Sequence, residues 1–168
     1  CIARATLGGN DFDPIKIFET EICHAMKIAF INIYNGLVER GSEVFVDEIA
    51  SKLSKYYSVT VFQSGIIQNK SYAQIQIKGV SYIPFQQWNA NKILLWINEF
   101  LYHLSVFLFS LKCIPHLQKN KYDWIIPVNG RMQVLVARVC RICMKFKILV
   151  SGHAGVGIED WINIFVGK

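Results

Sequence analysis

The sequence lacks the patterns that mark several common functional classes. It has no run of clustered lysine and arginine, which argues against a nucleic-acid-binding arm. It contains neither a Walker-type lysine motif nor a G-x-G-x-x-G stretch, and it shows no nucleophile elbow or Ser/His/Asp arrangement. No internal repeat or low-complexity linker is visible. These absences disfavour a P-loop NTPase, a typical dinucleotide-binding enzyme and an α/β-hydrolase.

Acidic residues are also scarce, with 12 Asp and Glu against 18 Lys and Arg, so the net charge is +6. A basic surface favours anionic partners such as nucleotide phosphates, anionic lipid or nucleic acid. The 168 residues are enough for one domain with a sizeable core but few for a two-domain enzyme. The 5 cysteines are unevenly spaced and no secretory signal pattern is seen, which predicts reduced thiols in a cytosolic compartment.

Residues 1–25 have no clear hydrophobic period and precede Met26, which opens directly into an apolar run. We therefore expect them to be an upstream or non-native segment outside the fold, and Met26 to be the natural start. The alternative is an ordinary extra strand or arm.

The stretch from Met26 to Gly65 reads as strand, loop, helix, strand. Lys27–Ile33 is a continuous apolar run typical of a strand buried on both faces of a parallel sheet. Ser42 is expected to cap a helix whose buried stripe is formed by Phe45, Ile49 and Leu53. A second strand follows at Val59–Phe62. The loop Tyr34–Gly41 then lies at the carboxyl edge of the sheet, where ligands bind in open α/β sheets.

The remaining pattern continues the alternation. Gln74–Ile83 predicts a third strand near a sheet edge, ended by Pro84. The later elements are a helix at Ile93–Leu111 ended by Pro115, a strand at Tyr122–Val128 with Pro127 at its end, a helix at Met132–Cys143 and a strand at Lys147–Val150. This order predicts a doubly wound α/β domain with a mostly parallel sheet.

Ile93–Leu111 is the most apolar part of the chain and is close to the ~20 residues that cross a bilayer. Glu99 and His103 lie mid-segment at helical spacing, and a central acidic group facing lipid costs roughly 2.5 to 3.5 kcal/mol. The favoured interpretation is a buried, aromatic-rich helix packed on the sheet. A helix whose exposed apolar side touches a membrane surface, and a true span, are the alternatives.

The loop after the first strand is a candidate phosphate site. Gly36 and Gly41 let the backbone approach a ligand, free amides at the start of the next helix suit an anion, and Arg40 can pair with it. The alternatives are a plain turn for the glycines and a solvated side chain for Arg40.

A second candidate follows the fifth strand, where small neighbours including Gly152 leave His153 accessible as a group that donates to, or orients, a sugar hydroxyl or phosphate. Its alternative is a structural histidine. Asp160 is expected near it or at a helix cap. Asn129 and Arg131 follow the fourth strand and point to the same edge, with turn formation the favoured role of Asn129.

The pairs Cys113-x-x-His116 and Cys140-x-x-Cys143 have zinc-like internal spacing. The first spans a helix exit, and the second falls inside a periodic helix without a knuckle turn. We interpret these cysteines as small buried hydrophobes and predict no metal site.

Taken together, Met26–Gly65, the stretch YDWIIPVNGR (Tyr122–Arg131) and KILVSGHAGVG (Lys147–Gly157) resemble the N-terminal domain of family 4-like glycosyltransferases of the GT-B type. The resemblance implies a Rossmann-like domain that holds the acceptor, in a hexosyltransferase-like enzyme that moves a sugar from a nucleotide-activated donor. By position, Gly36 and Gly41 match the family's donor phosphate loop, and His153 matches the catalytic histidine that faces the reacting sugar. The resemblance implies no metal and no cofactor besides the nucleotide-sugar substrate.

The sequence departs from the family at two points. GLVERG lacks the doubled glycine of the phosphate loop, and the acidic donor-binding motif of the second domain is absent. Residues 26–168 are therefore expected to be the acceptor domain alone, a fragment that does not turn over. The basic balance and the aromatic helix fit a cytoplasmic, membrane-associated protein with a lipid-linked acceptor. The competing hypothesis is a non-catalytic α/β nucleotide- or anion-binding or interaction module; a methyltransferase is disfavoured because no acidic residue ends the second strand.

Overall fold

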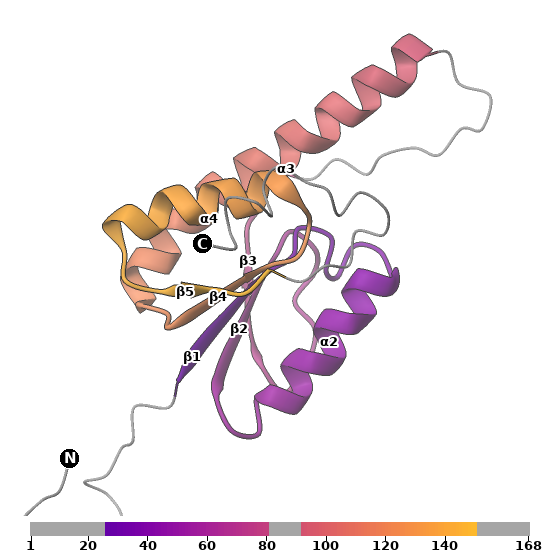
Figure 1. Cartoon of the computed structure of the whole chain (residues 1–168). Helices are drawn as coiled ribbons and strands as arrows, with labels where there is room; N and C mark the ends of the chain where they lie inside the picture. The colour runs from indigo at the N-terminus through magenta and orange to yellow at the C-terminus, as the bar shows by residue number, and fades with distance from the viewer. Residues whose placement is uncertain (1–25, 81–91, 151–168) are drawn as a thin grey trace, which may run out of the picture.

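β1 (Lys27–Ile31) lies at the centre of a parallel sheet whose order is β3-β2-β1-β4-β5 in the computed structural model (Figure 1). The other strands are β2 (Ser58–Gln63), β3 (Ala73–Gln76), β4 (Trp124–Pro127) and β5 (Lys147–Ile148), and every neighbouring pair is parallel. The helices are α2 (Gly41–Leu53), α3 (Lys92–Asn120) and α4 (Arg131–Cys143). The predicted Rossmann-like, doubly wound α/β fold is thereby confirmed.

The structure describes residues 26–80 and 92–150. The predictions for residues 1–25, 81–91 and 151–168 lie outside these ranges. The predicted third strand, Gln74–Ile83, is too long: β3 ends at Gln76, and the chain turns at Lys78 and Gly79, where the φ of Gly79 is +76°.

The alternation of side chains along β1 creates two cores, one on each face of the sheet. Ile28 and Phe30 pack with Val46 and Ala50 of α2, while Ala29 and Ile31 face the side covered by α3 and α4 (Figure 1). Both faces of β1 are buried, which explains why its sequence is a continuous apolar run rather than an alternating one. The sheet is thus the middle layer of three.

α2 differs from its prediction in both its cap and its buried stripe. The N-cap is Arg40, with no side-chain cap hydrogen bond, and the Ser42 hydroxyl donates instead to Glu43 Oε1 at 2.9 Å. The fully buried stripe is Glu43, Val46 and Ala50, and the predicted Phe45, Ile49 and Leu53 are half-buried beside it. The smaller side chains allow the helix to approach the sheet closely, so the larger ones lie along its rims.

α3 continues past Pro115 to Asn120, so the prediction that this proline ends the helix is wrong. Proline removes the hydrogen bond of its missing N–H and crowds the Leu111 carbonyl, but buried Cys113 and Leu117 on either side hold the helix on the sheet. The predicted burial of the helix applies to one stripe only, because its most apolar window is 22% buried. By length and composition this helix resembles a membrane span.

Other expectations are confirmed. β3 lies at a sheet edge, Pro127 is the last residue of β4, and α4 covers the predicted range within one residue. Cys113 and Cys140 are buried as expected, and burial raises the pKa of both thiols. Cys143 is exposed, which corrects its interpretation as a buried hydrophobe: it lies on the outer side of α4 at the helix end.

Candidate functional site at the carboxyl edge of the sheet

The chain order changes direction between β1 and β4. The connections through α2 lead from β1 to β2 and β3 on one side, and α3 then returns the chain to β4 on the other side of β1. In open α/β sheets ligands bind at such a switch point, beyond the carboxyl ends of the strands. The loops that begin at Asn32 and Asn129 meet here.

Asn129 joins these two loops. Its buried side-chain Oδ1 accepts a hydrogen bond from the Ile33 backbone N at 2.7 Å, and Gln133 Nε2 lies 3.3 Å from the same oxygen. Gln133 Oε1 in turn accepts the backbone N–H groups of Val128 at 3.0 Å and Asn129 at 2.8 Å. These bonds hold the loop after β4, in agreement with the turn-forming role that the sequence favours for Asn129.

Gly36 has a specific structural reason to be glycine. Its φ is +73°, and a Cβ there would lie 2.7 Å from Ile66 O. The two loops are also joined through Gln63, which accepts from Asn35 Nδ2 at 2.9 Å and donates to Ile66 O at 2.8 Å. Gly41 is different: it is the first residue of α2, and a Cβ added there would have no atom within 4 Å. The plain-turn alternative accounts for Gly36, and Gly41 remains free for a ligand to approach.

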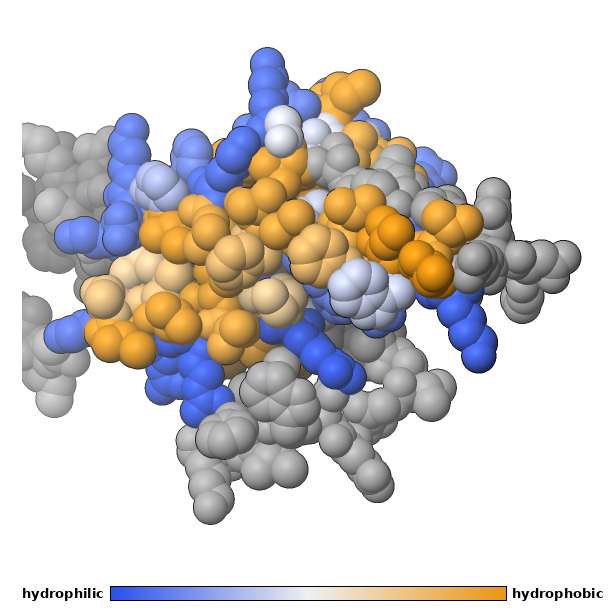
Figure 2. All heavy atoms as spheres, turned by 90° about the horizontal axis from the view of Figure 1, so that it is seen from above, coloured by the Kyte–Doolittle hydropathy of each residue, from blue (hydrophilic) through white to orange (hydrophobic). Residues whose placement is uncertain are grey.

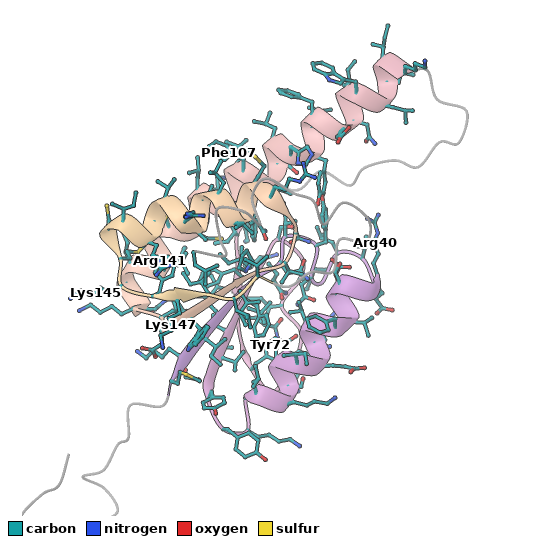
Figure 3. The ribbon with its side chains drawn as sticks, viewed as in Figure 1. Arg40, Tyr72, Phe107, Arg141, Lys145 and Lys147 are labelled. Carbon is teal, nitrogen blue, oxygen red and sulfur yellow. The ribbon has the colours of Figure 1, made fainter. Side chains whose placement is uncertain are left out.

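Arg40 lies over the ring of Tyr34, with Cζ 5.9 Å from the ring centroid. Figure 3 shows Arg40 at the start of α2. Tyr34 stacks on Tyr102 of α3 at 6.1 Å, and the Tyr102 hydroxyl donates to Asn129 O at 3.2 Å. Burial raises the pKa of Tyr34 to about 12, and the neighbouring Tyr102 adds to this. Three elements therefore meet around two neutral phenols and one exposed cation.

Glu43 is the residue that sequence reasoning missed. Its side chain is 3% exposed, and its Oε2 has no hydrogen-bond partner among the described residues. A carboxylate in the first turn of α2 is stabilised by the helix dipole, yet a buried oxygen without a donor is costly. The spacing of Glu43 with Val46 and Ala50 was the available signal, because it places all three on one helix face.

A cleft of about 370 Å³ lies between the β1 loop and α2. The residues that line it are mainly polar and acidic: Asn35, Gly36, Leu37, Val38, Glu39, Glu43, Val44, Asp47, Glu48, Gln68 and Lys70. Four carboxylates against one lysine make it a poor pocket for a phosphate and a good one for groups that donate hydrogen bonds.

No protein-family model matches the chain, and no curated protein matches it.

The other predicted site residues are not all brought to this cleft. Arg131 opens α4 and lines a separate apolar groove of about 380 Å³ between α3 and α4, with Phe107 and Leu135 among its neighbours. Gly152, His153 and Asp160 lie outside the described residues, so their predicted roles remain predictions.

One side of the acidic cleft is fastened by Asp47, which accepts hydrogen bonds from the Tyr72 hydroxyl and from Lys70 Nζ, the latter at 2.9 Å. Burial acts to raise the pKa of Asp47, but these hydrogen bonds outweigh it and hold the pKa below its usual value. Asp47 therefore stabilises the fold above the ordinary aspartate pKa of about 3.9, and this contribution is lost as pH falls through the lower folded-state pKa.

We predict that Tyr72→Phe lowers the free energy of unfolding by about 1 kcal/mol at neutral pH and flattens its decline below about pH 4. Tyr72 is buried beside α2, so the phenylalanine ring keeps the packing and removes only the hydroxyl (Figure 3). Urea unfolding across a pH series measures both effects, with exposed Tyr56→Phe as control. An acid dependence identical to that of the parent protein would contradict this role of Asp47.

Proposed function

We propose that this chain is the acceptor-side domain of a glycosyltransferase that transfers a sugar from a nucleotide-activated donor to an acceptor, in the synthesis of cell-surface polysaccharide or glycolipid. The observation that carries the proposal is the buried carboxylate of Glu43 with its unpartnered oxygen, beside Arg40 at the switch-point edge. A bound sugar hydroxyl would donate the hydrogen bond that Glu43 Oε2 lacks.

The charges around the cleft favour a sugar over a bare anion. Glu39, Asp47 and Glu48 line it together with Glu43, and such a pocket repels phosphate but accepts hydroxyl donors. The exposed guanidinium of Arg40 precedes α2, whose first amides also attract negative charge. A nucleotide-sugar and its acceptor together need both the acidic cleft and the positively charged start of α2. The alternative, an anion-binding module, needs only the positively charged start of α2.

Catalysis in this proposal is electrostatic and positional. Arg40 and the amides at Gly41 stabilise the leaving diphosphate, and His153 faces the reacting sugar. No metal and no cofactor besides the nucleotide-sugar are proposed. The complete reaction requires a donor-binding domain in addition to residues 26–168, so the isolated chain is not expected to turn over.

We further propose a cytoplasmic, peripheral membrane location and a lipid-linked acceptor. α3 is long and apolar enough to reach a membrane, and most of its apolar window is exposed. A transferase that rests on the bilayer meets a lipid-linked acceptor where that acceptor's polar end emerges.

The test is a transfer assay on the natural gene product, with a panel of nucleotide-activated sugars and a membrane lipid extract as the acceptor source. Arg40→Ala should lower kcat/KM roughly tenfold to a hundredfold, the range expected for loss of a hydrogen bond to a charged group. Lys55→Ala, which removes an exposed cation just beyond the other end of α2, serves as the control and should leave kcat/KM unchanged.

Two results would count against the transferase. If no donor in the panel yields product with any lipid fraction, transfer is not the activity. If a nucleoside diphosphate binds in an Arg40-dependent manner and the attached sugar contributes no affinity, the anion-binding module is the better description.

A further inference from the structure

The outer surface of α3 and α4 forms a continuous apolar face. Along α3 it contains Ile97, Leu101, Leu104, Leu108 and Leu111, spaced alternately by four and three residues, and along α4 it contains Leu135, Val139 and Ile142 at the same spacing. All of these side chains are exposed, up to 84% for Ile142. Figure 2 shows hydrophobic residues gathered over one side of the molecule, with hydrophilic residues on either flank. We call this surface the α3–α4 face.

The first turns of α3 extend beyond the sheet (Figure 1). There the apolar side chains point in several directions around the helix, among them Ile93, Leu94, Leu95 and Trp96, the last of which is 68% exposed. A helix that is apolar nearly all round is normally buried, so this segment requires an apolar environment that the described residues do not supply. An exposed patch of this kind marks an interaction site.

The distribution of charge over the helices indicates which kind of partner the α3–α4 face fits. α4 carries Arg131, Arg138 and Arg141 and no acidic residue, and α3 adds lysines against the single carboxylate of Glu99. On the opposite layer, α2 carries Glu43, Asp47 and Glu48 against Lys52. The molecule is thus electrically polarised, with its basic layer on the apolar side. A second copy of the chain would bring these cations together, whereas an anionic bilayer would neutralise them.

A basic cleft of about 990 Å³ continues this surface at the amino ends of the strands. The charged residues that line it are Lys27, Lys119, Lys121, Asp123, Arg141, Lys145 and Lys147. Figure 3 shows Arg141, Lys145 and Lys147 at the same end of α4 and the sheet, and Arg141 directly precedes exposed Ile142. Cationic side chains therefore lie next to exposed apolar ones, the arrangement with which amphipathic side chains meet a lipid interface.

The fold argues against a transmembrane position for α3. Val106, Phe109 and Cys113 are fully buried against the sheet, so the second half of the helix cannot leave the domain without exposing its core. The pair Glu99 and His103, with 3.7 Å between Oε1 and Nε2, adds a polar site in its first half. These features fit an interfacial helix.

We propose that the α3–α4 face docks this protein on anionic lipid bilayers, with the leucine-rich stripe at the acyl boundary and Arg138, Arg141 and Lys145 among the headgroups. The inference deepens the peripheral membrane location proposed above by naming the surface and the lipid, and it does not rest on the transferase activity because it requires no sugar or nucleotide.

The test is flotation of the natural gene product with phosphatidylcholine vesicles, with and without phosphatidylglycerol, in the absence of any donor. Binding should require phosphatidylglycerol and weaken with salt. The double variant Arg138→Gln with Arg141→Gln should bind about 30-fold more weakly, because each basic residue near an anionic surface strengthens binding about fivefold. The matched control, Lys52→Gln with Lys55→Gln, removes the same charge from the opposite layer and should bind as the parent does.

A second variant addresses the apolar part of the face. Val139→Ser with Ile142→Ser changes two exposed positions, so folding is preserved, and it should weaken binding to anionic vesicles at least tenfold. Equal binding to neutral and anionic vesicles, or equal loss in the α2 control, would overturn the proposal. So would concentration-dependent self-association in sedimentation that Val139→Ser with Ile142→Ser abolishes, because it would assign the face to a second copy.

Discussion

Gly65→Ala is expected to lower the free energy of unfolding by about 3 kcal/mol or more. A Cβ at Gly65 would lie 2.2 Å from the carbonyl carbon of Gly36 and 2.3 Å from Asn35 O. Both contacts are backbone atoms, and the Asn35 side chain is held by Gln63, so neither loop can yield locally. The clash must separate the loops after β1 and β2. Urea unfolding followed by circular dichroism measures the loss.

Gly41→Ala is the matched control for that substitution. No atom lies within 4 Å of its built Cβ, and the residue opens α2, where alanine is the better helix former. We expect unchanged stability or a gain of up to about 1 kcal/mol. If Gly65→Ala were as stable as the parent, the close packing of the two loops would be contradicted.

Gln133→Leu is expected to cost about 2 to 4 kcal/mol, although leucine has a similar volume. Gln133 is fully buried, and its Oε1 is the acceptor for two backbone N–H groups, those of Val128 and Asn129. Leucine leaves both donors unpaired in the interior, and each unpaired donor costs about 1 to 3 kcal/mol. The free energy of unfolding in urea measures the total.

Amide hydrogen exchange shows where in the structure Gln133→Leu acts. The amides of Val128 and Asn129 should exchange faster in Gln133→Leu, while amides in β2 keep their protection as long as global unfolding stays rarer than local opening. Gln118→Leu on α3 replaces an exposed glutamine and should change stability by less than about 0.5 kcal/mol. Unchanged exchange at Val128 would mean that its amide has another acceptor.

The roles of individual residues at the carboxyl edge show how far local pattern reasoning reaches. The position of the loop after β1 at the carboxyl edge of the sheet is predicted correctly, because strand direction and βα order follow from apolar runs. The local pattern does not distinguish its two glycines, yet a Cβ at Gly36 would lie 2.7 Å from Ile66 O, whereas a Cβ at Gly41 would meet no atom within 4 Å. Their difference comes from a loop about 30 residues further along the chain, which no local period describes.

The sequence by itself determined the element types, their order, the burial of the apolar run at β1 on both faces, and the edge position of β3. These depend on backbone periods of two and 3.6 residues and on where proline and glycine interrupt them, all of which are local properties. It also determined that α3 is long and apolar enough, by composition, to cross a bilayer.

Only the tertiary structure decided which side of each helix is covered. Glu43 is buried and Phe45 is not, since small Val46 and Ala50 set the approach of α2 to the sheet. Pro115 stays within α3 because Cys113 and Leu117 are held by the core. Burial and packing are sums over neighbours distant in the chain, so the acidic cleft and the α3–α4 face emerge only once the layers are assembled.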